Sequence, residues 1–248
     1  MHVFGLTDKG MVREQNQDAI FLTPDRIGPL PNLFVVADGM GGHNAGDVAS
    51  AQAISRFCAY IEDFPLAQLV QPGDYLDLLV NAAQDANASV FAKSRESEAM
   101  AGMGTTFTAC VIENGRALNV HVGDSRIYAI KPDKITQLTT DHTYVTQMVK
   151  LGKMTAEEAR KHPKRNMITS ALGTDSSLGL DGTAPELFGT TTVLLCSDGL
   201  TDMIDDAGIL DIVNRPGFVE DRTQMLVDEA NLRGGRDNIS VILIDIGR

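Results

Sequence analysis

Short apolar runs that end in an aspartate recur along this chain. Residues 33–37 form one such run, which is typical of a short buried strand, and the run ends at Asp38. Residues 191–197 also have the pattern of a strand, and Asp198 follows them. A carboxylate at the tip of a buried strand needs a cation, a cluster of hydrogen-bond donors or water as its partner. For Asp38 alone, a helix-capping aspartate in an ordinary strand-to-helix turn explains the pattern equally well.

The same device occurs twice more, at Asp124 and Asp237. Asp124 follows the alternating run 118–122, whereas Asp237 precedes the apolar run 239–246 and therefore stands where a strand begins. Since the start of one antiparallel strand lies beside the end of its neighbour, we expect the four aspartates to gather along one edge. Like charges at such short range repel, and a divalent cation would offset that repulsion. Oxygen ligands without any Cys/His spacing favour Mg²⁺ or Mn²⁺ over Zn²⁺.

Turn signals between apolar runs predict an antiparallel sheet. Strands are expected at 105–113, 116–122 and 126–130, joined by an Asn-Gly hairpin turn and by a Gly-Asp-Ser turn at 123–125. Consecutive hairpins without helices between them exclude a doubly wound Rossmann-type fold. Helical spacing of apolar residues predicts helices around 51–61, 74–94, 143–151, 155–161 and 219–232, and a further one capped by Asp205 or Asp206.

Length and composition favour one cytoplasmic domain. The 248 residues suffice for one large core, and because no Ser/Pro/Gly-rich linker interrupts them we expect a single domain over residues 1–248. No apolar run approaches the roughly 18 residues of a membrane span, and no signal peptide is evident, so we expect no membrane partner. The net charge of 21 − 33 = −12 argues against nucleic acid as a partner. Three widely spaced cysteines in apolar surroundings indicate free thiols in a reducing compartment.

Asp18 stands immediately before a short expected strand at 19–22, in the same position relative to its strand as Asp237. Arg13 lies five residues upstream of Asp18. A guanidinium near a cluster of carboxylates and metal has two interpretations. It forms a surface salt bridge, or it grips a phosphate with its planar fork.

The segment from about 142 to 175 reverses the sign of the chain's charge. Six of the basic residues fall in it: Lys150, Lys153, Arg160, Lys161, Lys164 and Arg165. One interpretation is an irregular, solvated segment. The other is a mobile flap that meets an anionic substrate, since long irregular insertions in compact domains are often functional.

Seven short motifs stand in order along the chain: Arg13-x-x-Asn16-Gln17-Asp18, Asp38-Gly39-Met40-Gly41-Gly42-His43, Met103-Gly104-Thr105-Thr106, Gly123-Asp124-Ser125-Arg126, Thr140-Asp141-His142, Ser197-Asp198-Gly199-Leu200 and Gly235-Arg236-Asp237-Asn238-Ile239-Ser240. Together they resemble the motifs of the metal-dependent protein phosphatases of type 2C, the PPM family, in its bacterial branch. The resemblance covers nearly the whole chain. It implies an α+β fold in which two antiparallel β-sheets pack as a central sandwich flanked by helices, in four layers (αββα), with a flap insertion at about 142–175.

The resemblance also implies which residues hold two core metal ions. Asp38 is similar to the carboxylate that bridges both ions, and the Gly39 carbonyl to a ligand of the second. Asp198 and Asp237 are similar to ligands of the first ion. Asp18 is similar to a carboxylate that acts on the second ion, largely through water.

Further roles follow from the resemblance at the rim of this centre. Asp124 resembles the ligand of a third ion in bacterial members, and Arg13 resembles the arginine that grips the phosphate. Gln17 stands where many members have Glu, which removes one water-mediated acidic contact. Met40 replaces a His that is proposed as the general acid in many eukaryotic members. His43 lies nearby and is a candidate substitute for that acid.

The function implied is hydrolysis of phosphoserine and phosphothreonine in proteins. Two core Mn²⁺ or Mg²⁺ ions, with a third as a further option, would activate a water molecule that attacks phosphorus in line, so no side-chain nucleophile is needed. The implied partners are phosphorylated proteins, including a bacterial serine/threonine kinase that the enzyme opposes, or the targets of that kinase.

Two alternatives stay open at this point. A non-catalytic, phosphatase-like module that binds phosphoproteins would be expected to lack metal carboxylates, yet Asp38, Asp198 and Asp237 are all present. A phosphatase acting on small phosphoesters is excluded poorly by the sequence. Rates on phosphopeptides and on sugar phosphates would separate that alternative from a protein phosphatase.

Overall fold

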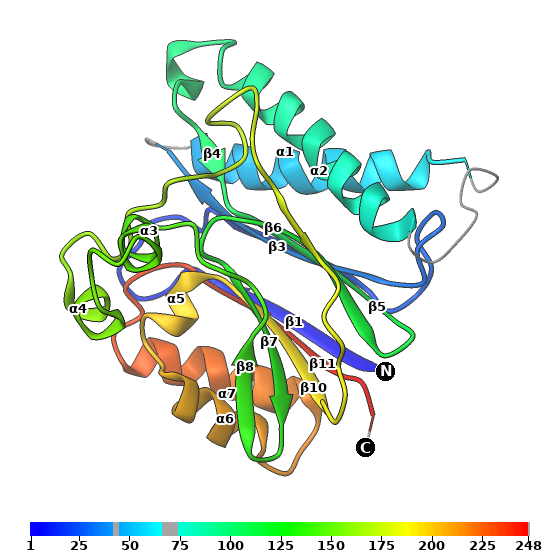
Figure 1. The fold of residues 1–248 in the computed structure, drawn as a ribbon, viewed down its shortest axis with the longest axis vertical. Coiled ribbons are helices and arrows are strands. Elements are labelled where there is room, and N and C mark those ends of the chain that lie inside the picture. Colours follow the sequence, from blue (N-terminus) through cyan, green and yellow to red (C-terminus); the bar gives the residue numbers. More distant parts are fainter. Residues whose placement is uncertain (42–44, 66–73, 248) are drawn as a thin grey trace.

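Two antiparallel sheets form the centre of the molecule (Figure 1), and the computed structural model describes residues 1–41, 45–65 and 74–247. The first sheet has five strands in the order β1 (His2–Asp8), β11 (Ile239–Asp245), β10 (Thr192–Cys196), β7 (Arg126–Lys131) and β8 (Lys134–Gln137). The second sheet has the order β2 (Asp18–Thr23), β3 (Leu33–Met40), β5 (Phe107–Glu113), β6 (Arg116–Val122) and β9 (Asp181–Thr183), with β4 (Gly104–Thr105) paired to β3.

Side chains between the two sheets form a continuous apolar layer. Phe34 and Cys110 from the second sheet pack in one buried cluster with Ile127, Leu195 and Ile242 from the first. These positions alternate with residues that face the helices, as the period of two in a strand requires. The interlocked layer fixes the position of one sheet against the other, and with it the strand ends that carry the aspartates.

Helices cover the outer face of each sheet, which confirms the four-layer α+β sandwich (Figure 1). The helices α1 (Ala45–Glu62) and α2 (Asp74–Lys93) lie on the second sheet, and their apolar residues share a buried cluster with it. The helices α6 (Asp206–Val213) and α7 (Val219–Leu232) lie on the first sheet in the same way. Asp205 is the residue that caps α6, by accepting a hydrogen bond from the Gly208 amide.

Several elements differ from the sequence-based expectation. The strand β3 continues through Asp38 to Met40, although the sequence predicts its end at Asp38. The turn at 123–125 does not close a hairpin, because β6 belongs to the second sheet and β7 to the first. The expected strand 105–113 is interrupted at Thr106, whose side chain bonds outside the ladder. The short strand β9 and the four-residue helix α5 (Asp198–Thr201) had no clear signal in the sequence.

The segment 142–175, called the flap segment below, contains the two short helices that its sequence predicts. These are α3 (Tyr144–Lys150) and α4 (Ala156–Lys161). Thr143 caps α3, and Thr155 forms a reciprocal capping box with Glu158 at the start of α4. Such caps satisfy the free amides of a helix that is too short to be stable alone.

Two further observations concern the whole chain. The three cysteines are free and buried, as expected. Within the described ranges, no helix has the length and apolar character needed to cross a bilayer.

Candidate metal centre and phosphate site

Asp18 and Asp38 lie side by side at one end of the second sheet. They occupy paired positions on β2 and β3, so their side chains are direct cross-strand neighbours. The backbone of Asp38 is fixed by the next motif along the chain. The Thr106 hydroxyl accepts from the Asp38 amide at 2.9 Å, and the Thr105 hydroxyl donates to the Asp38 carbonyl at 2.9 Å. The expected pairing of strand ends therefore holds for these two carboxylates.

The first sheet brings Asp198 and Asp237 to the same place. Asp198 begins α5 directly after β10, and Asp237 precedes β11, the neighbour of β10. The Ser197 amide donates to the Ser240 carbonyl at 3.0 Å, which keeps the end of one strand beside the start of the other. Asp124 joins them from the crossover between β6 and β7. The centre is thus assembled at an edge shared by both sheets.

These carboxylates repel one another, and burial together with this repulsion raises pKa values at the site. Burial, together with the charges of Asp18 and Asp198, raises the pKa of Asp38 well above its ordinary value. Burial and the charge of Asp124 do the same for Asp198. Burial raises the pKa of Asp18 to about 6, and burial with the charge of Asp141 raises that of Asp124 to about 7. Positive charge placed among them would relieve this cost.

Asp18 is held by hydroxyl groups of the opposite sheet. Ser197 and Ser240 both donate to Oδ2 of Asp18, at 2.8 and 2.7 Å. The Ser240 amide in turn donates to the Ser197 hydroxyl at 2.9 Å. One oxygen of Asp18 is therefore fully used across the sheet interface, while Oδ1 stays buried without a hydrogen-bond partner among the described residues.

Asn238 connects the start of β11, which Asp237 precedes, to the loop between β1 and β2, which carries Arg13. Its side-chain oxygen accepts from the Gln17 amide at 2.8 Å, and its side-chain nitrogen donates to the carbonyls of Lys9 and Gln15 at 2.9 and 2.8 Å. The side chain thereby closes the loop that contains Arg13. The same residue follows Asp237 directly, so the loop and the start of β11 are fixed to each other.

Arg13 projects from that loop toward the carboxylates. Its guanidinium donates to Oδ2 of Asp237 at 2.6 Å, and half of its side chain, 52%, is exposed. The charges of Asp38 and Asp198 also help to raise its pKa, after the bond to Asp237. Of the two interpretations given for Arg13, a surface salt bridge is therefore present. The exposed guanidinium is also placed to meet an anion above the carboxylates.

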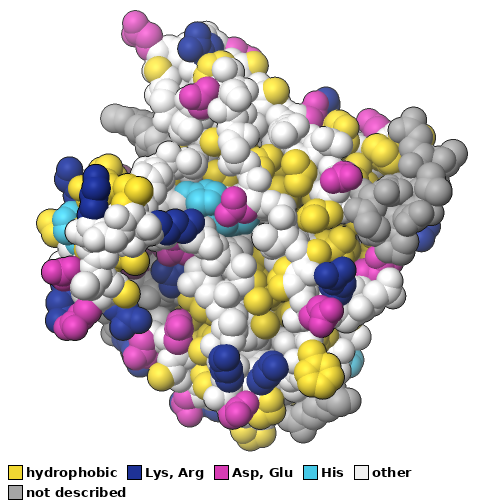
Figure 2. All heavy atoms as spheres, in the orientation of Figure 1, with side chains coloured by type: hydrophobic (Ala, Val, Ile, Leu, Met, Phe, Trp, Pro, Cys, Tyr) yellow, Lys and Arg dark blue, Asp and Glu magenta, His cyan; other side chains and the backbone are white. Residues whose placement is uncertain are grey.

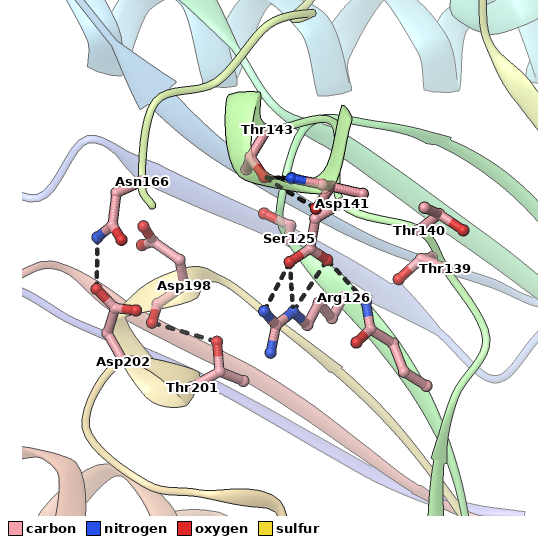
Figure 3. Close-up of polar contacts among 12 residues, drawn as sticks. Ser125, Arg126, Thr139, Thr140, Asp141, Thr143, Asn166, Asp198, Thr201 and Asp202 are labelled. Atoms are coloured by element: carbon pink, nitrogen blue, oxygen red, sulfur yellow. Dashed lines mark hydrogen bonds and ion pairs between the residues drawn. The ribbon is translucent and has the colours of Figure 1, made fainter. Parts of the chain in front are cut away.

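A second ion pair joins Arg126, two residues after Asp124, to Asp141 (Figure 3). Arg126 donates to both oxygens of Asp141, at distances down to 2.6 Å, and Gln137 also donates to Asp141 at 2.7 Å. Ser125, between Asp124 and Arg126, shares a 2.7 Å hydrogen bond with Thr106. These contacts fix the crossover that carries Asp124 against both sheets.

The flap segment is attached at the same edge (Figure 3). Asn166 donates to Oδ2 of Asp202 at 2.5 Å, and Arg165 reaches the same oxygen at 3.3 Å. Asp202 follows α5 directly and is its C-cap, whereas Asp198 is its first residue. At the start of the flap segment, the His142 amide donates to the Gly123 carbonyl at 2.7 Å. The flap segment thus contacts the core close to two candidate metal ligands, Asp198 and Asp124.

Gly39 occupies a position where no side chain fits. A Cβ there would lie 2.0 Å from the carbonyl oxygen of Gly46 and 2.5 Å from that of Gln17. The close approach of β3 to α1 explains why glycine follows Asp38. His43, the candidate general acid, lies outside the residues that the structure describes.

The donor set fits a hard divalent cation. Buried oxygens of Asp18, Asp124 and Asp198 have no hydrogen-bond partner among the described residues, and every donor is a carboxylate or carbonyl oxygen. In the described ranges, however, no three His, Cys, Asp or Glu side chains are arranged closely enough to coordinate one metal ion. The contacts explain this, because Asp237 is paired with Arg13, and Asp18 is turned toward two serines.

A family model described as Protein phosphatase 2C matches residues 11–233. This chain belongs to the protein phosphatase 2C family. The resemblance in the ordered motifs is thereby confirmed. The phosphatase is 36% identical to "Protein phosphatase PhpP" of Streptococcus pneumoniae, over 99% of this chain and 98% of that protein.

Solved structures agree with the observed fold. The crystal structure of "Serine/threonine phosphatase Stp1 from Staphylococcus aureus" superimposes with a TM-score of 0.91 at 33% identity, covering 99% of this phosphatase and 95% of that chain. The catalytic domain of "serine threonine protein phosphatase PstP in complex with 2 Manganese ions" superimposes with a TM-score of 0.83 at 33% identity, covering 100% and 98%.

Sequence reasoning missed the residues that support the ligands. Ser197, Ser240, Asn238 and Asp141 all stand inside the motifs quoted for the family, so a signal was present. Their partners, however, lie far away in sequence, as with Asp18 and Ser240. Asp202 has no motif of its own. Its position one helical turn after Asp198 was the available clue.

Proposed function

We propose that this phosphatase hydrolyses phosphoserine and phosphothreonine in proteins at the shared edge of its two sheets. Asp38 and the Gly39 carbonyl, with Asp18, Asp198 and Asp237, would hold two Mn²⁺ or Mg²⁺ ions. Asp124 would share a third ion with Asp198. The observation that carries the proposal is the convergence of these carboxylates from both sheets, with three buried oxygens left unpaired.

When bound, the ions would supply Lewis-acid activation of water and of the phosphoryl group. The residues of the chain prepare the place for this chemistry. Arg13 would bind phosphoryl oxygens, and its pairing with Asp237 holds the guanidinium over the carboxylates until a phosphate competes for it. Ser197 and Ser240 hold Asp18 with its second oxygen directed away from the serines. Asn238 fixes the Arg13 loop.

The leaving group, a serine or threonine alkoxide, needs a proton. His43 is our candidate for the acid that supplies it, because Met40 offers none. A bell-shaped dependence of kcat on pH that loses one limb in His43→Asn would support this role.

Two broader elements belong to the proposal. We treat residues 1–248 as one catalytic domain with the flap segment as its insertion, since both sheets contribute to one buried apolar layer. We also place the enzyme in the cytoplasm, opposite a serine/threonine kinase of the same cell, because its three cysteines are unpaired. Burial raises the pKa of Cys196 to about 12, which suits an inert thiol rather than a nucleophile.

Hydrolysis assays test the reaction directly. Wild type and Asp198→Asn would be assayed on para-nitrophenyl phosphate, a phosphothreonine peptide and a sugar phosphate, each with Mn²⁺, with Mg²⁺ and with chelator. We expect turnover only with added metal, a loss of about 100-fold or more in the variant, and a higher kcat/KM for the peptide than for the sugar phosphate. A folded wild type that is inactive with both metals would overturn the proposal.

A further inference from the structure

The flap segment carries a concentrated positive charge on an acidic protein. Between residues 150 and 165 there are six basic and two acidic residues, a local balance of +4, so the rest of the chain carries −16. In Figure 2, dark-blue side chains gather over the part of the molecule where Figure 1 draws α3 and α4. The basic residues of the flap segment therefore lie on one side of the molecule, with acidic side chains among them.

Half of these cations have partners within the molecule. Lys161 pairs with Glu157 at 3.0 Å, Arg165 with Asp202 at 3.3 Å, and the Lys164 ammonium lies 5.4 Å from the centre of the Tyr144 ring. These contacts hold the segment together and attach it to α5. They partly offset these three charges.

The other three cations, Lys150, Lys153 and Arg160, are exposed and have no ion pair among the described residues. They lie on α3, on the turn after it and on α4. Uncompensated charges of one sign on a surface attract segments of the opposite sign and raise their local concentration. Since the rest of the molecule is acidic, an acidic peptide would be repelled elsewhere and attracted here.

The position of this surface relates it to the phosphate site. The flap segment meets the core at Asp202, one turn from Asp198, and at Gly123, next to Asp124. Its exposed apolar side chains Leu151 and Met167 are 63% and 43% accessible. A polypeptide whose phosphate lies at Arg13 would thus have cationic and apolar side chains of the flap segment beside its flanking residues.

We propose that Lys150, Lys153 and Arg160 select phosphorylated segments that carry aspartate or glutamate close to the phosphorylated residue. This inference rests on the proposed phosphatase function and adds the class of protein substrate. The selection acts through long-range attraction and loose ion pairs, so it lowers KM and leaves the chemical step unchanged. It also weakens with salt, because the Debye length falls from about 10 Å at 0.1 M to about 3 Å at 1 M.

The test compares two phosphothreonine peptides that differ only in their flanking residues, glutamate in one and alanine in the other. At low ionic strength we expect KM of the wild type to be about tenfold lower for the acidic peptide, with equal kcat. The double variant Lys150→Glu/Lys153→Glu should lose or invert this preference. Its turnover of para-nitrophenyl phosphate, which has no flanking residues, should equal that of the wild type.

A matched control changes the same charges elsewhere. Lys131→Glu/Lys134→Glu lies on the β7–β8 hairpin, at the far end of β7 from Asp124, and should keep the full preference. A flap variant that also keeps the full preference, or a wild type without one, would overturn the inference while para-nitrophenyl phosphate turnover leaves the proposed function intact. A wild type inactive on every substrate would instead remove the proposed function, and this inference with it.

Discussion

Asp18 shows how a single buried carboxylate is prepared for a cation. One of its oxygens receives two hydroxyl hydrogen bonds from the opposite sheet, and the other has no partner among the described residues. A buried, unpaired carboxylate oxygen is costly, and such groups usually persist because they serve a site. Here the cost is explained if a cation completes the coordination.

The first prediction concerns the serine clamp, by which we mean the two hydrogen bonds from Ser197 and Ser240 to Asp18. In Ser240→Ala we expect Mn²⁺ to bind about tenfold to a hundredfold more weakly, because the ligand loses a hydrogen bond that orients it. Titration calorimetry measures this directly. Ser177→Ala, at an exposed loop position, is the control and should bind Mn²⁺ like the wild type. Unchanged affinity in Ser240→Ala would show that the clamp does not orient the ligand.

The second prediction concerns pH and stability. Burial raises the pKa of Asp124 to about 7, above its value in the unfolded chain, so the folded form binds the proton more tightly. Stability in chelator should therefore fall as pH rises from about 4 to about 7, by roughly 1.4 kcal/mol for each unit of pKa shift. The side chain introduced in Asp124→Asn has no ionisable proton and stays neutral at every pH in this range. It should be more stable than the wild type at pH 8 in chelator, with little difference at pH 4.

Thermal melts with chelator at both pH values check this sign. If the wild type and Asp124→Asn melt at the same temperature at pH 8 in chelator, the charged Asp124 carboxylate does not destabilise the fold. If saturating Mn²⁺ removes the difference, the relief comes from the cation, as ligand binding to the folded state requires.

Among the elements, the loop between β1 and β2 depends on a side chain from the far end of the chain. Asn238 makes three hydrogen bonds to this loop, and Arg13 projects from the loop toward Asp237. Neither strand pattern nor turn chemistry specifies where such a loop points. Its position is a tertiary property, fixed by β1 pairing with β11.

The third prediction follows from that contact. In Asn238→Ala we expect KM for a phosphopeptide to rise about tenfold while kcat falls less, because each lost hydrogen bond contributes about 1 kcal/mol to the position of Arg13. Asn214→Ala is a matched control, since it also removes one side-chain bond to a carbonyl, that of Pro132, far along the chain. If Asn238→Ala lowers kcat by as much as Asn214→Ala does and leaves KM unchanged, Asn238 contributes to folding and not to the position of Arg13.

The elements themselves were largely predictable from sequence, and the exceptions have a physical reason. Apolar periodicity placed α7 correctly because this helix has one buried stripe. It placed the start of β3 correctly but not its end, because the strand continues beyond the apolar run, through Asp38 to Met40. The turn at 123–125 was misjudged as a hairpin, because turn residues specify a change of direction and not which sheet receives the next strand. The contacts of Ser197 and Asp141 were invisible for a related reason, since they depend on how the sheets face each other.

At the scale of the whole molecule, two sheets with separate outer helices meet along one acidic edge. The apolar layer between them fixes the strand ends, and the strand ends place carboxylates that repel one another. The fold therefore places mutually repelling carboxylates together at one edge. This arrangement is expected where a bound cation has a functional role. The aspartates at strand ends made this edge predictable from sequence.

The central claim is that this edge holds metal ions through Asp38. The most direct measurement is titration calorimetry of Mn²⁺ into chelator-stripped wild type and Asp38→Asn, with circular dichroism to verify the fold. We predict at least two bound ions per wild-type chain. In the variant we predict the loss of both core ions, because in our proposal Asp38 would contribute a ligand to each of them. Equal stoichiometry and affinity in the two proteins, or no Mn²⁺ binding to the folded wild type, would contradict the account.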